Sequence, residues 1–408
     1  MPSEDTQSFS PPRLVTLLLI GVIASFSGGL INPTIPAIQS SFAHLPNSET
    51  LAQLVSTMSA PIVVIVAPIV GYLLDRHRRK PILIAAILIY GVGTSIAFFL
   101  DSLYLILATR VLDGIAVAAV MVTVPTLISD YYSGGRRESV MGWYGAVQAG
   151  GGAVAVIIGG LIADVNWKYI FLVFALALLL IPPVIRYLPE PDVTRSPSEV
   201  GRLEAVAKIV RDSPIFVLVG IYLVVAFAML TNNLIHIEAP YYLQNTLGIS
   251  GSMTGVTLSA AMVAGVVAAA SYGRVKKRCR HITIVAFAFT TATIGYVIIS
   301  AMDSFPVVFV GIVIGACGLG FILPTANDWV AAVVHERYRG RALSGVTMMM
   351  YLGFAISPFA PAPLIDQFGR STTFFVWAGF LLVAAVGATA LWWVSEDSVV
   401  SAPAEAAD

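Results

Sequence analysis

Residues 103 to 128 form an apolar stretch that nevertheless contains a cation and an anion, Arg110 and Asp113. The two residues are three positions apart, so on a helix they would face the same side. The stretch is long enough to cross a bilayer, and both charges would then lie roughly 10 to 15 Å below the membrane surface. Ionisable groups at that depth are costly and point to a function. Either Asp113 exchanges a proton, or it neutralises Arg110 as a structural ion pair.

The composition is that of an integral membrane protein. Of the 408 residues, 57% are hydrophobic and only 11% are charged, and the mean hydropathy is +0.86. Soluble proteins carry about 25% charged residues. The formal net charge is zero, which gives no reason to expect nucleic acid as a partner. Cys279 and Cys317 form no disulfide or metal-ligand pattern, so no metal site is expected.

Twelve apolar segments are each long enough to span a bilayer as a helix, which takes about 20 residues. They cover residues 14–40, 51–74, 81–100, 103–131, 138–163, 168–187, 214–243, 252–272, 282–301, 305–333, 342–365 and 373–394. This pattern predicts an all-α integral membrane protein with twelve transmembrane helices.

One long polar connection divides these spans into two groups of six. The expected organisation is a disordered N-terminal tail at 1–12, a six-helix bundle at 13–187, a linker at 188–213, a second six-helix bundle at 214–394 and a disordered tail at 395–408. Within the linker, residues 200–210 have apolar side chains at helical spacing, which predicts a helix along the membrane surface.

Lysine and arginine residues predict the orientation, because they are enriched in cytoplasmic loops. With a cytoplasmic N-terminus, all 23 except Lys168, Arg370 and the buried Arg110 lie on the cytoplasmic side. We therefore expect a multi-pass protein of the cell membrane (plasma or inner membrane) with both termini, the linker and both tails in the cytoplasm.

The two groups of spans repeat each other at a nearly constant offset: Gly71 aligns with Gly273, and Asp101 with Asp303. Two repeated bundles that face each other across a central cavity are a transporter architecture. The charged pair departs from the repeat, since Ile312 and Gly315 stand where the first half has Arg110 and Asp113. A buried polar group present in only one half is expected to serve the ligand rather than the fold.

The loop between the second and third spans reads Gly-Tyr-Leu-Leu-Asp-Arg-His-Arg-Arg-Lys over residues 71–80. It is similar to the signature Gly-x-Leu-Ala-Asp-Arg-x-Gly-Arg-Arg/Lys of the major facilitator superfamily, with Arg78 in place of glycine. The resemblance extends over essentially the whole chain. It implies the major facilitator fold, in which two six-helix bundles are related by a pseudo-twofold axis.

The same resemblance implies that this loop is a conformational latch. Asp75 would contact the N-terminal end of a helix in the other half, near Arg341, where the helix dipole favours a carboxylate by about 0.3–1 kcal/mol. The two arginines would pair with cytoplasmic acids. The latch residues are Gly71, Asp75, Arg76, Arg79 and Asp130. Positive-inside anchoring is the alternative, and it is preferred for Arg78 and Lys80.

Arg110 and Gly114 resemble the fourth-span motif of this family. In its proton-coupled drug-efflux branch, this arginine is linked to proton transfer. The chain has Asp113 where the family usually has glutamine or another polar residue. The fifth span keeps the Gly-Gly of the antiporter motif at 159–160 but has Ala-Val at 155–156 in place of Gly-Pro, which leaves the direction of transport open.

Other polar and aromatic side chains are candidates for a central cavity. Glu238 is a second candidate for carrying a proton, unless it is solvated near the outer surface. Substrate-cavity candidates come from the first, fifth, seventh and eleventh spans: Asn32, Trp143, Tyr144, Gln148, Asn232, Asn233, His236, Tyr241 and Tyr351. For each aromatic residue among them, helix packing is the alternative role.

No GxxxxGK[ST], HExxH or GxSxG pattern and no zinc-ligand spacing occurs in the sequence. We therefore expect neither an ATP-driven pump nor an enzyme, with no catalytic residue and no cofactor.

These features predict a secondary active transporter that works by alternating access as a monomer in the lipid bilayer. By resemblance to drug:proton antiporters, it would export small amphipathic organic compounds or drugs in exchange for protons. The alternative in this class is proton-coupled transport of a polar metabolite such as a sugar, and Na⁺ is the alternative coupling ion. A sensor or scaffold of the same fold, without transport, is the alternative from another class.

Overall fold

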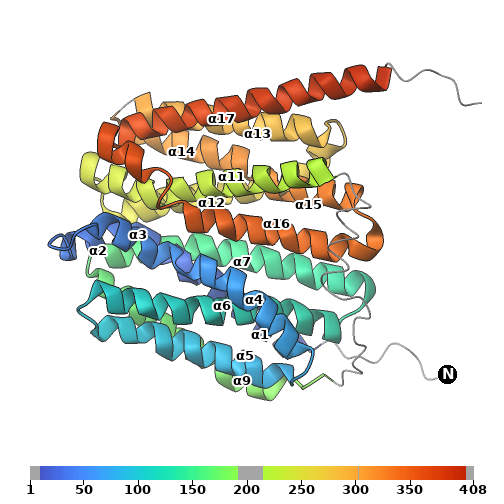
Figure 1. Cartoon of the computed structure of the whole chain (residues 1–408). Coiled ribbons are helices and arrows are strands. Elements are labelled where there is room, and N and C mark those ends of the chain that lie inside the picture. The colour runs from blue at the N-terminus through green and yellow to red at the C-terminus, as the bar shows by residue number, and fades with distance from the viewer. Residues whose placement is uncertain (1–9, 192–214, 302, 401–408) are drawn as a thin grey trace, which may run out of the picture. The chain divides into compact units, whose positions relative to one another are not determined.

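A computed structural model of the chain describes residues 10–191, 215–301 and 303–400. Every regular element in these ranges is a helix (Figure 1). Residues 1–9 and 401–408, which belong to the two expected tails, lie outside the described residues. So does most of the expected linker (192–213), including the expected surface helix at 200–210.

The first half of the chain contains nine α-helices and five shorter helical segments within the described residues. The α-helices are α1 (Pro11–Gly29), α2 (Ile35–Ser41), α3 (Ser48–Thr57), α4 (Ser59–Leu74), α5 (Arg79–Leu88), α6 (Leu103–Tyr131), α7 (Gly134–Ala163), α8 (Ile170–Phe174) and α9 (Ile181–Tyr187). The shorter 3-10 or π segments are η1 (Asn32–Thr34), η2 (Ile89–Gly93), η3 (Ile96–Phe99), η4 (Trp167–Tyr169) and η5 (Ala175–Leu180).

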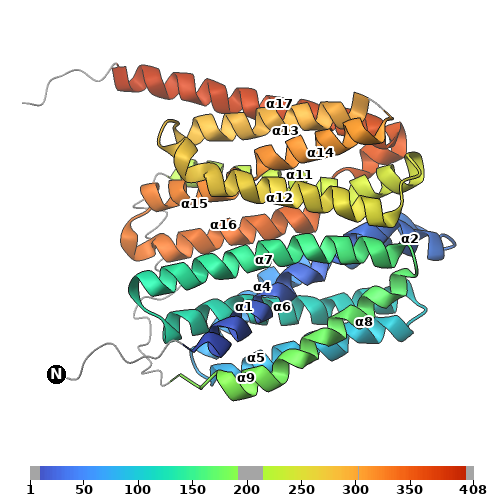
Figure 2. The same cartoon turned by 180° about the vertical axis from the view of Figure 1, so that it is seen from behind.

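The second half consists of longer helices, seen from two sides in Figures 1 and 2. They are α11 (Ile215–Tyr241), α12 (Gly251–Lys276), α13 (His281–Ala301), α14 (Phe305–Leu319), α15 (Ile322–Val333), α16 (Glu336–Ile356) and α17 (Ala362–Val400). The π segment η6 (Tyr242–Thr246) follows α11 directly.

Eleven helical segments among the described residues are long and apolar enough to cross a membrane. Several consist of consecutive helices, such as Pro11–Ser41 and Phe305–Val333. The remaining expected span, 342–365, corresponds to α16 and the residues after it, and α16 begins in a polar stretch that contains Arg339 and Arg341. The predicted all-α membrane fold is confirmed.

Breaks within spans occur where the sequence removes backbone donors or crowds the preceding turn. The first span ends its regular α-helix at Gly29 and continues as η1 and α2, which contain Pro33 and Pro36. Proline has no N–H and its ring clashes with the preceding turn, so it interrupts a helix. The break places Asn32 at the start of a short 3-10 turn, where its side chain is buried.

Contacts divide the chain into two compact units. The first contains the described residues of 1–199 together with 233–259 and 354–360, and the second contains those of 200–232, 260–353 and 361–408. The end of α11 and the start of α12 thus pack with the first half of the chain. The bundle boundaries 13–187 and 214–394 remain a prediction from the sequence.

In the first unit, α6 is enclosed by α1, α4 and α5 and is the most buried of the spans. Gly114 explains the close approach of α4: a Cβ atom at this position would lie 2.6 Å from Ile62 Cβ and 2.9 Å from Ser59 O. In the second unit, α13 packs against α14 and α17. The first unit therefore supplies a closed, apolar environment for the charges on α6.

Candidate functional site

Arg110 and Asp113 are both fully buried, with 0% of each residue exposed. Since they are one turn apart on α6, their side chains reach into the same region of the first unit. The shortest distance between the charged groups is 3.9 Å, from Arg110 Nη1 to Asp113 Oδ1. This is an ion pair without a hydrogen bond, because an N–H···O bond has a length of about 2.7–3.2 Å.

The Asp113 carboxylate accepts a hydrogen bond from a serine on a neighbouring helix. The Ser27 hydroxyl on α1 donates to Asp113 Oδ2. Ser59, at the start of α4, also lies close to this carboxylate, whose Oδ1 has no hydrogen-bond partner among the described residues. Asp113 is therefore hydrogen-bonded to α1 and faces α4, in addition to its place on α6.

The Arg110 guanidinium lies among aromatic rings. Its Cζ is 5.3 Å from the ring centre of Phe171 and 5.1 Å from that of Phe174, both on α8. Within the described part of the chain, its three nitrogen atoms have no hydrogen-bond acceptor. A desolvated cation–π contact contributes about 2 kcal/mol. Aromatic faces and one carboxylate are thus what stabilises this buried cation.

This arrangement is suited to proton exchange. Removing two ions from water costs several kcal/mol for each, and an ion pair offsets that cost only when its geometry is good. Here the pair is long and the arginine lacks hydrogen bonds. The Ser27 hydroxyl can turn to donate to an ionised carboxylate or to accept from a protonated one. Asp113 can therefore be accommodated in both protonation states without a change of partners.

Glu238 is a second buried acid, with 2% of the residue exposed. Its Oε1 accepts a hydrogen bond of 2.7 Å from Gln53 Nε2. Gln53 lies on α3 and Glu238 on α11, and both belong to the first unit. Glu238 is buried rather than solvated, so the alternative of a solvated surface acid is wrong. Glu238 is hydrogen-bonded to Gln53, whereas Asp113 is hydrogen-bonded to Ser27.

The polar cavity candidates of the first and seventh spans are held by different neighbours. Asn32 is buried and accepts a hydrogen bond from the Ser56 hydroxyl. Asn233 Nδ2 donates to Ser357 Oγ at 2.6 Å. His236 is half-buried, and its Nδ1 has no hydrogen-bond partner among the described residues. Tyr241 is buried.

The aromatic candidates have unequal positions. Trp143 is 60% exposed, whereas Tyr144 is buried and its hydroxyl accepts a 3.0 Å hydrogen bond from Gln148 Nε2. These three residues lie on α7. Asn232 and Tyr351 are half-buried and belong to the second unit. A single cavity that contains all the candidates remains a prediction.

The expected latch residues lie between α4 and α5 and at the end of α6. Arg79 Nη1 is 2.6 Å from Asp130 Oδ2. Arg76 stacks over the Tyr72 ring at 4.2 Å, and Asp75 is exposed. A Cβ atom at Gly71 would meet no atom of the described residues within 4 Å, and close helix approach at Gly71 stays a prediction. The latch function stays a prediction.

Sequence reasoning missed the residues that surround the charged pair. Ser27, Ser59, Phe171 and Phe174 come from three other spans, and nothing in their local sequence marks them as partners of α6. Gln53 could have been predicted as a site residue from the sequence, because a lone amide in an apolar span needs a hydrogen-bond partner.

Comparison with known proteins gives the family. The sequence matches the Major Facilitator Superfamily profile at residues 17–235 and again at 221–408. The chain belongs to the major facilitator superfamily. It is therefore a multi-pass membrane transporter of a small molecule and not an enzyme, as the sequence predicts.

Similar members of the superfamily include exporters. The bacillibactin exporter of Bacillus subtilis (strain 168) is 23% identical over 379 residues, which cover 87% of this chain and 90% of that protein. The tetracycline resistance protein, class H, of Pasteurella multocida is 29% identical over 170 residues, 41% of this chain and 42% of the relative. The second match thus covers less than half of either protein.

Solved structures agree on the fold. A bacterial homologue of the human lysosomal transporter Spinster, in an inward-facing and occupied conformation, superposes with a TM-score of 0.77 over 94% of this chain and 97% of that chain. The nucleoside transporter NupG superposes with a TM-score of 0.71 over 92% and 99%. Their sequence identities are 16% and 12%, so these likenesses concern the fold alone.

Proposed function

We propose that this transporter exports small amphipathic organic compounds in exchange for protons, and that Asp113 carries the proton. The observation that supports the proposal most directly is the buried Arg110–Asp113 pair, whose carboxylate accepts a hydrogen bond from Ser27 rather than from the arginine. A charge pair that served only the fold would gain more from direct hydrogen bonds. Export is favoured because similar proteins are named as exporters and resistance proteins.

Alternating access would move the two bundles, 13–187 and 214–394, against each other around a central site. The protein would work as a monomer in the cell membrane, with both termini in the cytoplasm. Protonation of Asp113 would leave Arg110 as a buried cation without its counter-ion. That state differs electrostatically from the ion pair, so substrate and proton can each bias the same conformational equilibrium.

The test measures transport in proteoliposomes with an imposed pH gradient. Ethidium and tetracycline serve as amphipathic probes, and pyranine inside the vesicles reports proton movement. Asp113→Asn should abolish probe-driven proton movement and the acceleration of probe transport by the gradient. Asp101→Asn is the matched control, because Asp101 is an exposed acid whose partner is Lys168. Unchanged, gradient-dependent transport in Asp113→Asn would remove Asp113 from the coupling mechanism.

A second candidate function is proton-coupled transport of a polar metabolite, with Glu238 as the proton carrier. It is favoured by the buried polar groups of the first, second and seventh spans, where Asn32, Gln53 and Glu238 hold hydrogen bonds in an otherwise apolar setting. Glu238→Gln separates the two when a radiolabelled sugar replaces the amphipathic probes in the same vesicles. Loss of gradient dependence in Glu238→Gln alone, with Asp113→Asn unaffected, would favour this candidate.

A further inference from the structure

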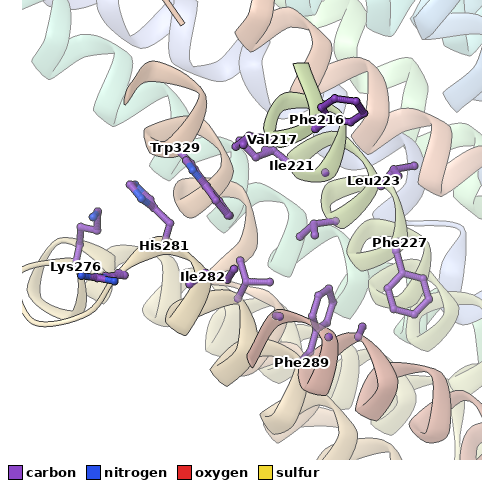
Figure 3. A pocket seen from close by; sticks show the side chains of 17 residues that line it. Phe216, Val217, Ile221, Leu223, Phe227, Lys276, His281, Ile282, Phe289 and Trp329 are labelled. Carbon is purple, nitrogen blue, oxygen red and sulfur yellow. The ribbon is translucent and has the colours of Figure 1, made fainter. Parts of the chain in front are cut away.

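A cavity of about 810 Å³ lies within the second unit, between the ends of α11, α13, α15 and α17 (Figure 3). Its walls are largely apolar, with Phe216, Ile221, Phe227 and Phe289 among the lining residues. None of the lining residues belongs to the site around Asp113. The cavity lies beside the basic loop at 274–280, on the side that the charge distribution predicts to be cytoplasmic.

The depth of the cavity matches one leaflet of a membrane. On α11 its lining runs from Phe216, at the second residue of the helix, to Phe227. A helix rises 1.5 Å per residue, so this wall is about 16 Å long. The hydrocarbon core of a bilayer is about 30 Å thick, or about 15 Å for each leaflet. An acyl chain that enters beside the basic loop would therefore be matched in length.

The cavity is polar at one end only. Lys276, Arg280 and His281 line it there together with Trp329. Phe227 and Phe289 lie further along the helices (Figure 3). The His281 and Trp329 rings are stacked, with centres 5.4 Å apart and planes 10° apart. Tryptophan, lysine and arginine are the residues that occupy the interface between headgroups and hydrocarbon. This end is thus placed where a lipid headgroup would lie.

At this end two cations, Lys276 and Arg280, outnumber the one neighbouring acid of the described residues, Asp328. Asp328 Oδ2 accepts a 2.7 Å hydrogen bond from Tyr272 and lies 2.8 Å from His281 Nε2. Among the residues that have been described, neither Lys276 nor Arg280 forms an ion pair. Two cations at the mouth of an apolar slot are complementary to a phosphate attached to acyl chains.

We infer that this cavity is a binding site for an anionic phospholipid, with its phosphate at Lys276 and Arg280 and an acyl chain along α11. The site is separate from the proton and substrate site. It gives the transporter a preference for anionic over zwitterionic lipid in the leaflet that adjoins the basic loop.

Native mass spectrometry of the purified full-length protein tests the charge requirement. The probes are phosphatidylglycerol and phosphatidylcholine with identical acyl chains, added at equal concentration. Wild-type protein should retain phosphatidylglycerol in preference. Each basic residue near a lipid surface strengthens attraction by roughly fivefold, so Lys276→Gln/Arg280→Gln should weaken retention about twenty-five-fold. The control Lys277→Gln/Arg278→Gln removes two exposed cations of the same loop that do not line the cavity.

A second pair of variants tests the apolar slot without changing charge. A Cβ atom at Gly387, which lines the cavity on α17, would meet no atom of the described residues within 4 Å. The same holds for Gly379 on the same helix, which does not line the cavity. Gly387→Leu should fill the slot and reduce lipid retention severalfold, whereas Gly379→Leu should retain lipid like wild type.

Three results would overturn the inference. One is equal retention of the two lipids by wild-type protein. Another is the same loss in both double glutamine variants, which would indicate general attraction to the loop. The third is full lipid retention by Gly387→Leu. That result would mean that the lipid binds outside the cavity, which would then be open to another occupant such as the chain's own segment at 192–214.

Discussion

Asp113 takes a hydrogen bond from Ser27, which is 86 residues away in the sequence, while Arg110 on its own helix stays 3.9 Å from it. The acid is thus connected more directly to the neighbouring helix α1 than to its own counter-ion. A helix-to-helix hydrogen bond can change when helices move, whereas an ion pair within one turn moves as a unit. Asp113 is therefore placed to sense a rearrangement of α1 against α6.

Removing one member of the charged pair should destabilise the protein more than removing both. Arg110→Met leaves Asp113 buried without its cation, and Asp113→Leu leaves Arg110 without its anion, and loss of one partner of a buried pair costs about 3–5 kcal/mol. Replacing both by apolar residues is often neutral. We expect Arg110→Met/Asp113→Leu to unfold at a higher temperature than either single variant in thermal unfolding of the detergent-purified protein.

The double variant also separates a structural role from a coupling role. If it regains stability but not gradient-driven transport, the pair serves coupling. Asp101→Asn again controls for the loss of a charge, since exposed ion pairs contribute about 0–1 kcal/mol. Recovery of both stability and coupled transport in the double variant would mean that the pair only stabilises the fold.

Ser27→Ala should destabilise the first unit more than Ser25→Ala, although both serines lie on α1. Ser27 donates to a carboxylate, whereas Ser25 donates to the backbone oxygen of Gln148 at 2.6 Å. Hydrogen bonds to charged groups contribute about 1.5–3 kcal/mol, and neutral ones about 0.5–1.5 kcal/mol. Thermal unfolding of the two variants measures the difference. Equal shifts would indicate that the Asp113 carboxyl group is not charged in the resting protein.

The sequence was sufficient for the fold class and for the burial of Arg110 and Asp113, because apolar runs of bilayer length leave few other places for them. It did not reveal the partners. Gln53 and Glu238 are 185 residues apart, and their contact depends on how α3 and α11 pack. The lipid-sized cavity depends in the same way on the spacing between α11, α13, α15 and α17, which no local pattern encodes.

Gly160→Ala should be harmful, while Gly145→Ala on the same helix should not. A Cβ atom at Gly160 would overlap Gly251 O and lie 3.0 Å from Gly255 Cα, so even a methyl group would push α7 away from α12. Overpacking costs about 1–3 kcal/mol. At Gly145 a Cβ atom would meet nothing within 4 Å, and alanine in a helix is favoured over glycine by roughly 0.5–1 kcal/mol.

Thermal unfolding should therefore shift downward for Gly160→Ala and stay level or rise for Gly145→Ala. The contact between α7 and α12 joins the fifth and eighth spans, so transport should also change only in Gly160→Ala. A Gly160→Ala protein as stable and active as wild type would show that these helices are not in close contact in the membrane.

Asp164 should control the ordering of the first turn of α12. Its Oδ1 accepts a 2.6 Å hydrogen bond from Gly251 N, and its Oδ2 accepts one of 2.9 Å from Ser252 N. These N–H groups begin α12 and have no partner within the helix. Losing such a cap costs about 0.5–2 kcal/mol. Asp164→Ala should speed amide hydrogen exchange at residues 251–254 several-fold, with little change at the far end of α12.

Asp164→Asn keeps one side-chain oxygen as an acceptor and should give an intermediate rate. Identical exchange in all three proteins would mean that Asp164 does not hold the start of this helix.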